Sequence, residues 1–553
     1  MSASTMTPSN RQSSSRAERQ ATLAGTGTVL RFMLRRDRIR STAWVIGIGL
    51  LGFYFANAIQ LVAEDEAELA ELASLFTDPV GRLMTGPAFG MATPTYERFF
   101  SAGYVLFLYI LIALMSVFTV VRHTRAEEQT GRAELMRSNV VGRHATLSAT
   151  LILVVITNLG VGLLVLAGAL AGDFAFEGSL LVAAAGVSTG LFFAGAAAVA
   201  VQLSESSRGS SAMAGGLVAL AYVIRMGGDM AEQGGSALSW FSPLGWAQQT
   251  APYVEDRWWP LALLLVFAVA LTGIGFWLST KRDLEASLMP TRMGRESARP
   301  SLGTPLGIAV KTLKGGLRGW GIALVICGLM FGAYAQALVD AADDLPEEFA
   351  MIFSGETMML GYLAYMGLFM AIFVAAAGVG ALTQLRGEEH RGRAEFGLSA
   401  PLSRTTWLRA HLAVLLGGLL TILLLVGLAM GAGAAAVLET DGGDYFFDLV
   451  VASLHQTPAV LAVVGIVTAL FGWWPRTASP VGWTIVGYAA FMTNFGQILE
   501  VPDFFHELNI FGHLSQYPVE EVAWGPVVIL TALGVGGIVL GLLGWNRREI
   551  NRV

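Results

Sequence analysis

Two short segments carry the densest groups of opposite charges in this chain. The first, Arg125–Glu134, reads RAEEQTGRAE, and the second, Arg386–Glu395, reads RGEEHRGRAE, displaced by 386 − 125 = 261 residues. Carboxylates and guanidinium groups at such spacing form charged hydrogen bonds with one another or with a partner protein. Each copy lies between two long apolar runs, so the sequence indicates an internal repeat of one membrane unit whose loops share a task.

Local signals within the charged segment predict its shape. The apolar run before it is expected to continue as a helix to Gln129, and Glu128 and Arg132 have the spacing of a favourable helical ion pair. Gly131 is expected to bend the chain, and residues 132–137 to form a short second helix. The register also holds beyond the segments, where Ser138, Arg143 and Leu147 match Ser399, Arg404 and Leu408.

The other ionisable residues favour no enzyme chemistry. Acidic stretches at Glu64–Glu71 and Asp340–Glu348 can supply acid–base groups or bind a cation, but their helical spacing favours a solvated amphipathic helix. The seven His are scattered without the spacing of metal ligands. His455 and Gln456 lie together inside an apolar run, where a polar pair serves helix-to-helix hydrogen bonding or substrate contact. We therefore predict no catalytic residue and no metal site.

Nucleotide binding is not expected in this chain. A P-loop needs a glycine-rich segment that ends in Gly-Lys followed by Ser or Thr, and none of Lys281, Lys311 and Lys314 follows a glycine. The one cysteine, Cys327, lies in an apolar run, which excludes a disulfide within the chain. No cofactor is therefore expected here.

Composition predicts a membrane protein. Charged residues make up 14% of the chain and hydrophobic residues 54%, and apolar runs long enough to cross a bilayer recur. The first half has six runs, at Thr42–Val62, Phe99–Val121, Ala145–Leu170, Ser179–Val201, Ala212–Arg225 and Pro260–Leu278. The second half has six more, at Trp320–Val339, Met358–Leu385, Leu408–Val437, Leu449–Trp473, Val481–Leu499 and Pro526–Trp545. The expected fold class is an all-α polytopic membrane protein with twelve transmembrane helices in two repeated six-helix bundles.

The distribution of charge predicts the orientation. If the N-terminus is inside, only four of the 35 Lys and Arg residues fall outside, namely Arg82, Arg98, Arg225 and Arg257. This distribution satisfies the positive-inside rule. Both termini are therefore expected in the cytoplasm, and the protein in the cell membrane as a multi-pass protein.

Further matches extend the repeat along both halves. Trp44 matches Trp320 at an offset of 320 − 44 = 276, which pairs Gln60 with Gln336 near the outer ends of the first helices. Later in each half the offset is 518 − 252 = 266, at which Pro252, Glu255, Trp258 and Pro260 return as Pro518, Glu521, Trp524 and Pro526. Basic amphipathic stretches precede the first spans, and each is expected to lie on the inner membrane surface as an elbow helix. They are Leu30–Arg40 and Ile308–Arg318.

These features divide the chain into four parts. Residues 1–22 are expected to form a disordered cytoplasmic tail, because they are polar and lack an apolar stripe. An elbow helix and six spans follow at 23–280, a cytoplasmic linker at 281–303, and a second elbow helix with six spans at 304–553.

The second charged segment carries a family resemblance. Arg386–Glu395 with the following Ser399–Arg404 (SAPLSR) resembles the coupling region of ABC-2 type exporter permeases. Nearly the whole chain after the tail is similar to the actinobacterial branch of polyketide-antibiotic exporters, the tetronasin-resistance type, in which two six-helix halves are fused. The first copy departs from the pattern, because Asn139–Gly142 reads NVVG where Ala400–Ser403 reads APLS.

The resemblance implies an ABCG-like arrangement of helices and a permease without enzyme activity of its own. Such a permease moves large amphipathic or hydrophobic compounds, antibiotic-like, drug-like or lipid-like, out of the cell. A separate ABC ATPase, in two copies, would bind ATP and Mg; the remaining partners would be membrane lipids and the amphipathic substrate, with no nucleic acid. The residues that would dock the ATPase are Arg125, Glu127, Glu128, Arg132, Glu134, Arg143, Arg386, Glu388, Glu389, Arg393, Glu395 and Arg404.

Alternatives remain for the function and for the substrate path. The chain can instead be a secondary active multidrug transporter, or a membrane-embedded transferase that uses the outer carboxylates. A secondary transporter is expected to bury titratable residues within its spans, and the sequence shows none at mid-depth. The residues predicted to line the path are Gln60, Gln336, His455 and Gln456. The alternative role of the two repeated amides is hydrogen bonding to a neighbouring helix.

Overall fold

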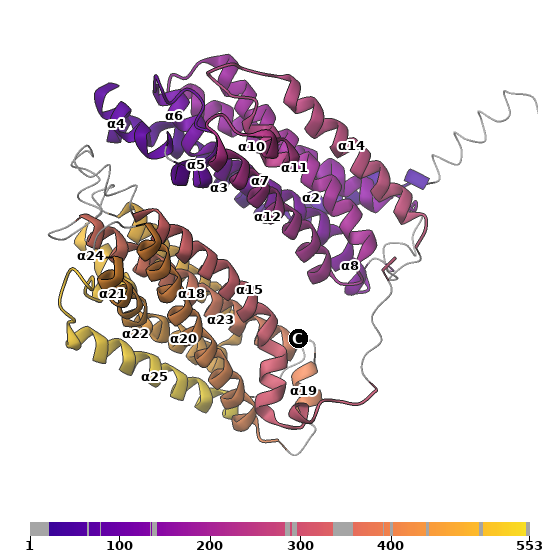
Figure 1. The fold of residues 1–553 in the computed structure, drawn as a ribbon. Coiled ribbons are helices and arrows are strands. Elements are labelled where there is room, and N and C mark those ends of the chain that lie inside the picture. Colours follow the sequence, from indigo (N-terminus) through magenta and orange to yellow (C-terminus); the bar gives the residue numbers. More distant parts are fainter. Residues whose placement is uncertain are drawn as a thin grey trace, which may run out of the picture. The chain divides into compact units, whose positions relative to one another are not determined.

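A computed structural model describes residues 22–63, 66–77, 79–132, 134, 141–282, 288–289, 296–335, 358–390, 392–398, 402–437, 442–496 and 502–548. All regular secondary structure in these residues is helical. The chain divides into two compact units, residues 1–293 (unit 1) and residues 294–553 (unit 2), and each is described by itself. In Figure 1, unit 1 runs from indigo to magenta and unit 2 continues through orange to yellow.

Six long helices form most of unit 1. They are α3 (Arg38–Val62), α7 (Val105–His123), α10 (Ala145–Ala171), α11 (Phe176–Leu203), α12 (Ser207–Ala231) and α14 (Trp259–Ser279). At one end, which we call the loop end, lie α2 (Thr26–Arg36) and α8 (Arg125–Gln129), with which the first charged segment begins. At the opposite end, which we call the cap end, lie α4 (Glu66–Thr77), α5 (Pro79–Thr85) and α6 (Tyr96–Gly103) (Figure 1). Two more short helices lie at this end, η1 (Ala237–Phe241) and α13 (Pro243–Gln248), because Ser239 donates to Asp229 of α12 and Gln248 donates to the backbone oxygen of Thr85.

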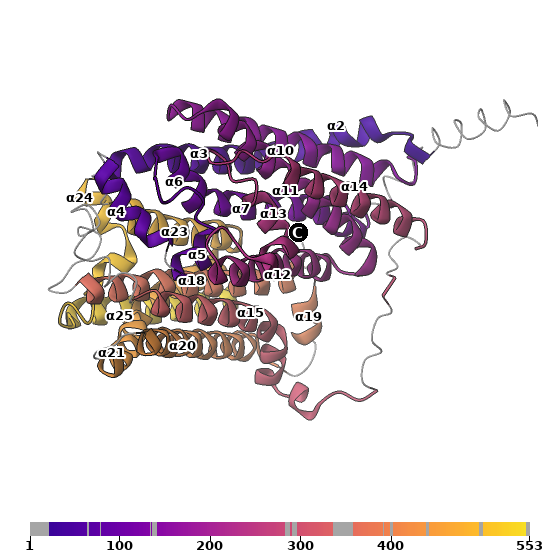
Figure 2. The same cartoon turned by 45° about the horizontal axis from the view of Figure 1, so that its top comes forward.

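Unit 2 has the same plan with different breaks. Its long helices are α15 (Pro305–Ala333), α18 (Met358–His390), α20 (Arg404–Val437), α21 (Gly442–His455), α22 (Thr457–Trp473), α23 (Pro475–Phe495) and α25 (Trp524–Arg547). The loop end carries η2 (Pro300–Gly303) and α19 (Arg393–Leu398), and the cap end carries α24 (Asp503–Glu507) and η4 (Ile510–His513). Within this unit α15 lies beside α18 and α20, as Figure 2 shows, and α25 packs against α22.

Eleven helical segments of the described residues are long and apolar enough to cross a membrane, six in unit 1 and five in unit 2. They coincide with eleven of the twelve predicted runs. The remaining run, Val481–Leu499, falls mostly on α23, which is helical but is not among the eleven. Thr477, Thr484 and Asn494 contribute to its low hydropathy. The protein is thus an all-helical, multi-pass membrane protein.

The two predicted elbow helices differ. In unit 1, α2 is a separate helix, because the chain turns at Asp37 (φ −100°, ψ 14°) before α3 begins. In unit 2 the prediction of a separate elbow is wrong: α15 is unbroken and contains both Ile308–Arg318 and the start of the first span. The repeat places Leu313 where unit 1 has Asp37 (37 + 276 = 313).

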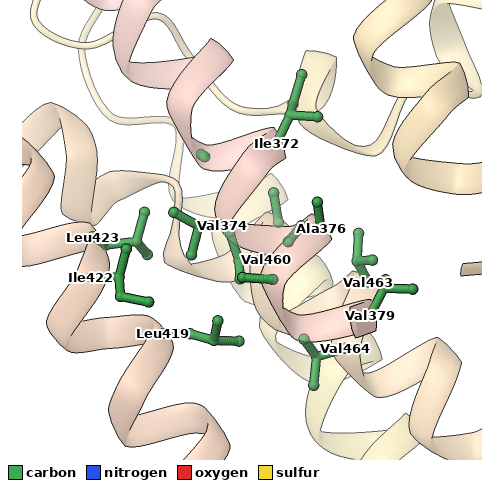
Figure 3. Packing of buried hydrophobic residues seen from close by; sticks show 14 of the residues in the cluster. Ile372, Val374, Ala376, Val379, Leu419, Ile422, Leu423, Val460, Val463 and Val464 are labelled. Carbon is green, nitrogen blue, oxygen red and sulfur yellow. The ribbon is translucent and has the colours of Figure 1, made fainter. Parts of the chain in front are cut away.

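Close packing of small and branched side chains holds each bundle together. In unit 2, Val374 and Val379 of α18 lie among Leu419 of α20 and Val460 and Val464 of α22 (Figure 3). Lipid offers helices little hydrophobic reason to associate, so close van der Waals contact matters more than in water.

The closest helix pair of unit 2 is α22 with α25. A Cβ atom added to Gly465 would lie 2.3 Å from the backbone oxygen of Gly534, and one added to Gly472 would lie 2.2 Å from that of Gly541. Both positions therefore require glycine, and the last helix of the unit is held along its length.

Candidate functional site at the loop ends

The charged segments turn in the same way in both units. In unit 1, α7 ends at His123 and the short α8 follows, whereas in unit 2 α18 continues unbroken to His390. A glycine then reverses the chain in each copy, Gly131 and Gly392, both with φ of 70°. This left-handed conformation favours glycine, so the predicted bend is confirmed. The predicted short second helix is present in unit 2 as α19, and most of 132–137 lies outside the described residues.

Each charged segment is fastened to the end of its unit by a buried ion pair. Glu128 receives hydrogen bonds from Arg282 at 2.7 and 3.0 Å, and Glu389 receives them from Arg548 at 2.6 and 2.7 Å. The two glutamates are 8% and 7% exposed. Glu128 and Glu389 match at the offset of 261, and Arg282 and Arg548 at 266 (282 + 266 = 548). We call each of these pairs a clamp.

A second repeated contact supports each clamp. Arg143 donates to the backbone oxygen of Arg282 at 3.3 Å, and Arg404 donates to that of Arg548 at 2.9 Å. The third long helix of each unit, which begins beside Arg143 or Arg404, is thereby joined to the arginine that lies just after the last long helix, α14 or α25. Three elements of each unit meet at the clamp.

Sequence reasoning missed Arg282 and Arg548. They lie 154 and 159 residues from their glutamates, so no local spacing reveals the pairs. The sequence did contain a signal for these arginines, namely the repeat offset of 266. This offset was recognised from Pro252 to Pro260, and it also relates Arg282 to Arg548.

The surroundings of the two clamps differ. In unit 1, Arg125 is 1% exposed and also donates to Glu128 at 2.7 Å. Its counterpart Arg386 donates instead to the backbone oxygen of Arg476 at 3.2 Å. In unit 2 the guanidinium of Arg548 lies 4.7 Å from the Trp545 ring centroid, and also over Phe471. The clamp of unit 1 is therefore charge-rich, and that of unit 2 is partly aromatic.

A second pair of charges is repeated nearer the surface. Arg132 lies 3.9 Å from Glu127, and Arg393 lies 3.1 Å from Glu388. The predicted helical pair of Glu128 with Arg132 is wrong, because the turn at Gly131 takes Arg132 off the helix face and Glu128 is held by its clamp. The side chains of Arg132 and Arg393 remain 59% and 54% exposed.

In unit 1, charged groups join the junction of α2 and α3 to the end of α7. Arg122 donates to Asp37 at 2.7 and 3.0 Å, and His123 Nε2 lies 3.0 Å from the same carboxylate. Arg36 pairs with Glu127 beside it. Burial alone would raise the pKa of Asp37, but the Arg122 hydrogen bonds and the neighbouring positive charges hold it below its ordinary value.

Unit 2 makes the matching contact without charges. Position 313 is Leu313, and Thr383 and Gln384 stand where unit 1 has Arg122 and His123 (offset 261). Gln384 Nε2 donates to the backbone oxygen of Thr312 at 2.7 Å. One neutral hydrogen bond thus replaces the ion pairs.

The structure divides the residues predicted to dock a partner. The side chains that are buried in internal ion pairs are Arg125, Glu127, Glu128 and Glu389. Their charged groups lie below the surface of the described residues, so a direct contact of these four with a partner stays a prediction. The exposed members are Arg132, Glu134, Arg143, Arg393 and Arg404, and the partly exposed ones are Arg386, Glu388 and Glu395. These eight residues form one set in each unit, and we call each set the loop surface of its unit.

The structure describes three of the four residues predicted for the substrate path. Gln60 Nε2 donates to the backbone oxygen of Gly172 at 2.9 Å, which favours its packing role. Gln336 lies outside the described residues. His455 and Trp524 are among the residues that line a groove of about 400 Å³ at the cap end of unit 2, and His455 Nε2 lies 3.3 Å from Ser515 Oγ. Gln456 is buried beside it.

The cap end of unit 1 has a polar network that sequence reasoning missed. Arg225 on α12 is fully buried, pairs with Asp229 at 3.2 Å, and donates to the backbone oxygens of residues 82–84 at the end of α5. Arg82 on α5 donates in return to the backbone oxygens of Asp229 and Met230. Each arginine thus satisfies carbonyl groups that the end of the other helix leaves unpaired.

The two remaining cations predicted to lie outside are also bound within this cap. Arg98 donates to Thr93 and, at 3.2 Å, to the backbone oxygen of Tyr253. Arg257 donates to Glu255 at 2.6 Å. All four exceptions to the charge rule therefore have partners inside unit 1. Among the residues described, no group of three or more His, Cys, Asp or Glu is arranged to hold a metal ion.

Comparison with known proteins places the chain in a family. The model of a protein family described as "Multidrug efflux system permease Rv1217c, C-terminal domain" matches residues 27–278 and 302–546, which is most of both units. The chain is also 34% identical over 532 residues to the "Multidrug efflux system permease protein Rv1217c" of Mycobacterium tuberculosis (strain ATCC 25618 / H37Rv), and the match covers 95% of each protein. The chain therefore belongs to the Rv1217c family of multidrug efflux system permeases.

Proposed function

We propose that this protein is the transmembrane permease of an ATP-driven efflux system that moves large amphipathic or hydrophobic compounds out of the cell. The observation that carries the proposal is the loop end, where clamp, glycine turn and exposed arginine recur in both units. Two like surfaces on one chain suit two copies of one partner. The printed name of the relative, a multidrug efflux permease, supports the transported class.

The finer family assignment is part of the same proposal. The charged segment and the fused halves resemble ABC-2 exporters of polyketide antibiotics, so we assign the partner as an ABC ATPase that binds ATP and Mg. The loop ends then face the cytoplasm, as the positive-inside rule favours. Of the two loop surfaces, Arg132 and Arg393 are the strongest docking residues, because both are more than half exposed.

The clamps connect the charged segments, where the partner would dock, to the residues after the last long helix of each unit. A load on the charged segment of either unit reaches Arg282 or Arg548 through a charged bidentate contact. In unit 2 the load continues into α25, which is packed against α22 through its glycines. Docking is thereby connected to the last span of the unit rather than to the loop alone.

The rival secondary transporter needs a titratable group within the membrane that is free to change its protonation. Arg225 and Asp229 are such a pair by position, since both lie in the candidate span α12. However, Arg225 is held by backbone oxygens, and Asp229 receives a hydrogen bond from Ser239 at 2.6 Å. These contacts favour a structural role for the pair.

Transport in inverted membrane vesicles distinguishes the two classes. Vesicles that contain the full chain, co-expressed with its ABC ATPase, are expected to accumulate an amphipathic dye only when ATP is supplied. Vanadate should stop this accumulation. Transport that continues without hydrolysis and stops when the proton gradient collapses would exclude the proposal.

The docking residues are tested in the same vesicles. Arg393→Glu is expected to lower ATP-driven transport and ATPase co-purification by about tenfold, since it reverses a charge at an interface, and Arg132→Glu should act in the same direction. Arg318→Glu on α15, exposed and outside both charged segments, is the matched control. Unchanged co-purification in both loop variants would remove the docking assignment while leaving the transport result intact.

A further inference from the structure

A groove of about 370 Å³ opens between α3 and α7 of unit 1, near the loop end. It is polar at its mouth and apolar along its length. The residues that line it are Arg40, Ala43, Trp44, Gly47, Ile48 and Leu111. From Arg40 to Ile48 the groove follows about two turns of helix, or 8 × 1.5 Å, roughly 12 Å.

A positive charge remains at the mouth of the groove. Arg40 is exposed, and no hydrogen bond or ion pair joins its guanidinium to another of the described residues. The carboxylate of Asp37, whose charge acts on Arg40, is already bound by Arg122 and His123. Arg40 is therefore available to an anion from outside the chain.

Neighbouring residues place this mouth at the membrane surface. The preceding helix α2 exposes Arg31 and Arg35 together with Phe32, and Ile39 at the start of α3 is 78% exposed. Exposed cations and large apolar side chains on one short segment are typical of a helix that lies between headgroups and acyl chains. Trp44 lies one turn further along α3, and tryptophan is enriched at this depth.

We propose that the groove binds one anionic phospholipid, with its phosphate on Arg40 and an acyl chain along Gly47, Ile48 and Leu111. The charge at the mouth selects an anionic headgroup, and the apolar wall has the length of roughly ten methylene groups at about 1.25 Å each. The repeat places Gly316 at the position of Arg40 (40 + 276 = 316), so unit 2 lacks this cation at the matching position.

Native mass spectrometry of the full chain, extracted from vesicles of equal phosphatidylglycerol and phosphatidylcholine, tests this proposal. Wild type is expected to retain one phosphatidylglycerol in preference to phosphatidylcholine. Arg40→Gln should weaken that preference about tenfold or more, since a charge-assisted contact is lost. Arg38→Gln, an exposed arginine that does not line the groove, should match wild type.

A second variant tests the apolar wall. A Cβ at Gly47 meets nothing within 4 Å, so Gly47→Leu fills the groove without a clash and should displace the bound lipid at an unchanged Tm. Gly273→Leu on α14, also with open space at Cβ, is the control and should retain the lipid. Three outcomes would each overturn the proposal. Wild type could retain both lipids equally, or Arg40→Gln could retain as much phosphatidylglycerol as wild type. The third outcome is a wild type that carries no lipid together with a Gly47→Leu variant of lowered Tm.

Discussion

The loop ends of the two units resemble each other far more than the cap ends do. At the loop ends, a buried glutamate pairs with the arginine that lies just after the last long helix in both copies. At the cap end of unit 1, Arg225 and Asp229 form a fully buried pair, whereas the offset of 266 places Phe491 and Phe495 at these positions of unit 2. A contact kept in both copies indicates a shared task, and one present in a single copy indicates a task of that unit.

Loss of the cap network should have the largest effect. Arg225→Met leaves the Asp229 carboxylate buried without its cation and should cost about 3–5 kcal/mol of unfolding free energy. The double variant Arg225→Met with Asp229→Leu should recover most of this loss. Denaturant unfolding in detergent measures the cost, and hydrogen exchange at residues 79–90 should show that the loosening is local to the cap. Phe491→Met in unit 2 is the control and should cost less than about 1 kcal/mol. If Arg225→Met also lowers the unfolding free energy by less than about 1 kcal/mol, the pair of Arg225 and Asp229 does not hold the cap together.

Removal of one clamp should cost less, and unequally in the two units. Arg548→Ala removes the arginine that binds Glu389 and also its contact with Trp545, which should cost roughly 2–4 kcal/mol. Arg282→Ala should cost about 1–2 kcal/mol, because Arg125 still donates to Glu128. The unfolding midpoint of each variant in denaturant gives the order. An Arg282→Ala variant that is less stable than Arg548→Ala would show that Arg125 does not compensate.

The junction of α2 with α3 offers a test in which one unit supplies the control for the other. Asp37→Leu introduces the residue of unit 2 and leaves Arg122 and His123 without their carboxylate. The unfolding free energy should fall by about 1–3 kcal/mol. The triple variant that also carries Arg122→Thr and His123→Gln copies the whole set of unit 2 and should recover part of this loss. Thermal unfolding of the three proteins decides the point, and a triple variant less stable than Asp37→Leu would rule out equivalence of the two sets.

The glycine turns should give the smallest and most equal effects. Gly131→Ala and Gly392→Ala each place a side chain at φ of 70° with no atom within 4 Å of the new Cβ. Backbone strain is then the whole effect, and each should cost about 1 kcal/mol. Parallel denaturant titrations of the two variants suffice. A difference above about 1 kcal/mol between them would mean that the two turns are held differently.

Much of the fold was predictable because periodic apolar runs and the repeat are local or regular signals. Eleven of the predicted runs coincide with candidate spans, and the bend at Gly131 follows from the residue type. The position of Glu128 four residues before Arg132 was misleading, because the same glycine ends the helix between them. A spacing rule for helices holds only where the helix continues.

The candidate site was predicted as a segment and not as a set of contacts. Its charged residues were recognised, but which of them point inward depends on Arg36, Arg282 and Arg548, which approach from distant parts of the chain. The unbroken α15 was missed for a related reason. Both elbow stretches are basic and amphipathic, and the difference between Asp37 and Leu313 is a single residue.

The contrast between Asp37 and Leu313 has a consequence for how such a protein can evolve. In a homodimer of single units, one gene encodes both copies, so a substitution that suits one side is imposed on the other. Fusion into one chain removes that constraint: unit 1 keeps a carboxylate with Arg122 and His123, while unit 2 keeps Leu313 with Thr383 and Gln384. Each half can therefore acquire its own compensating neighbours.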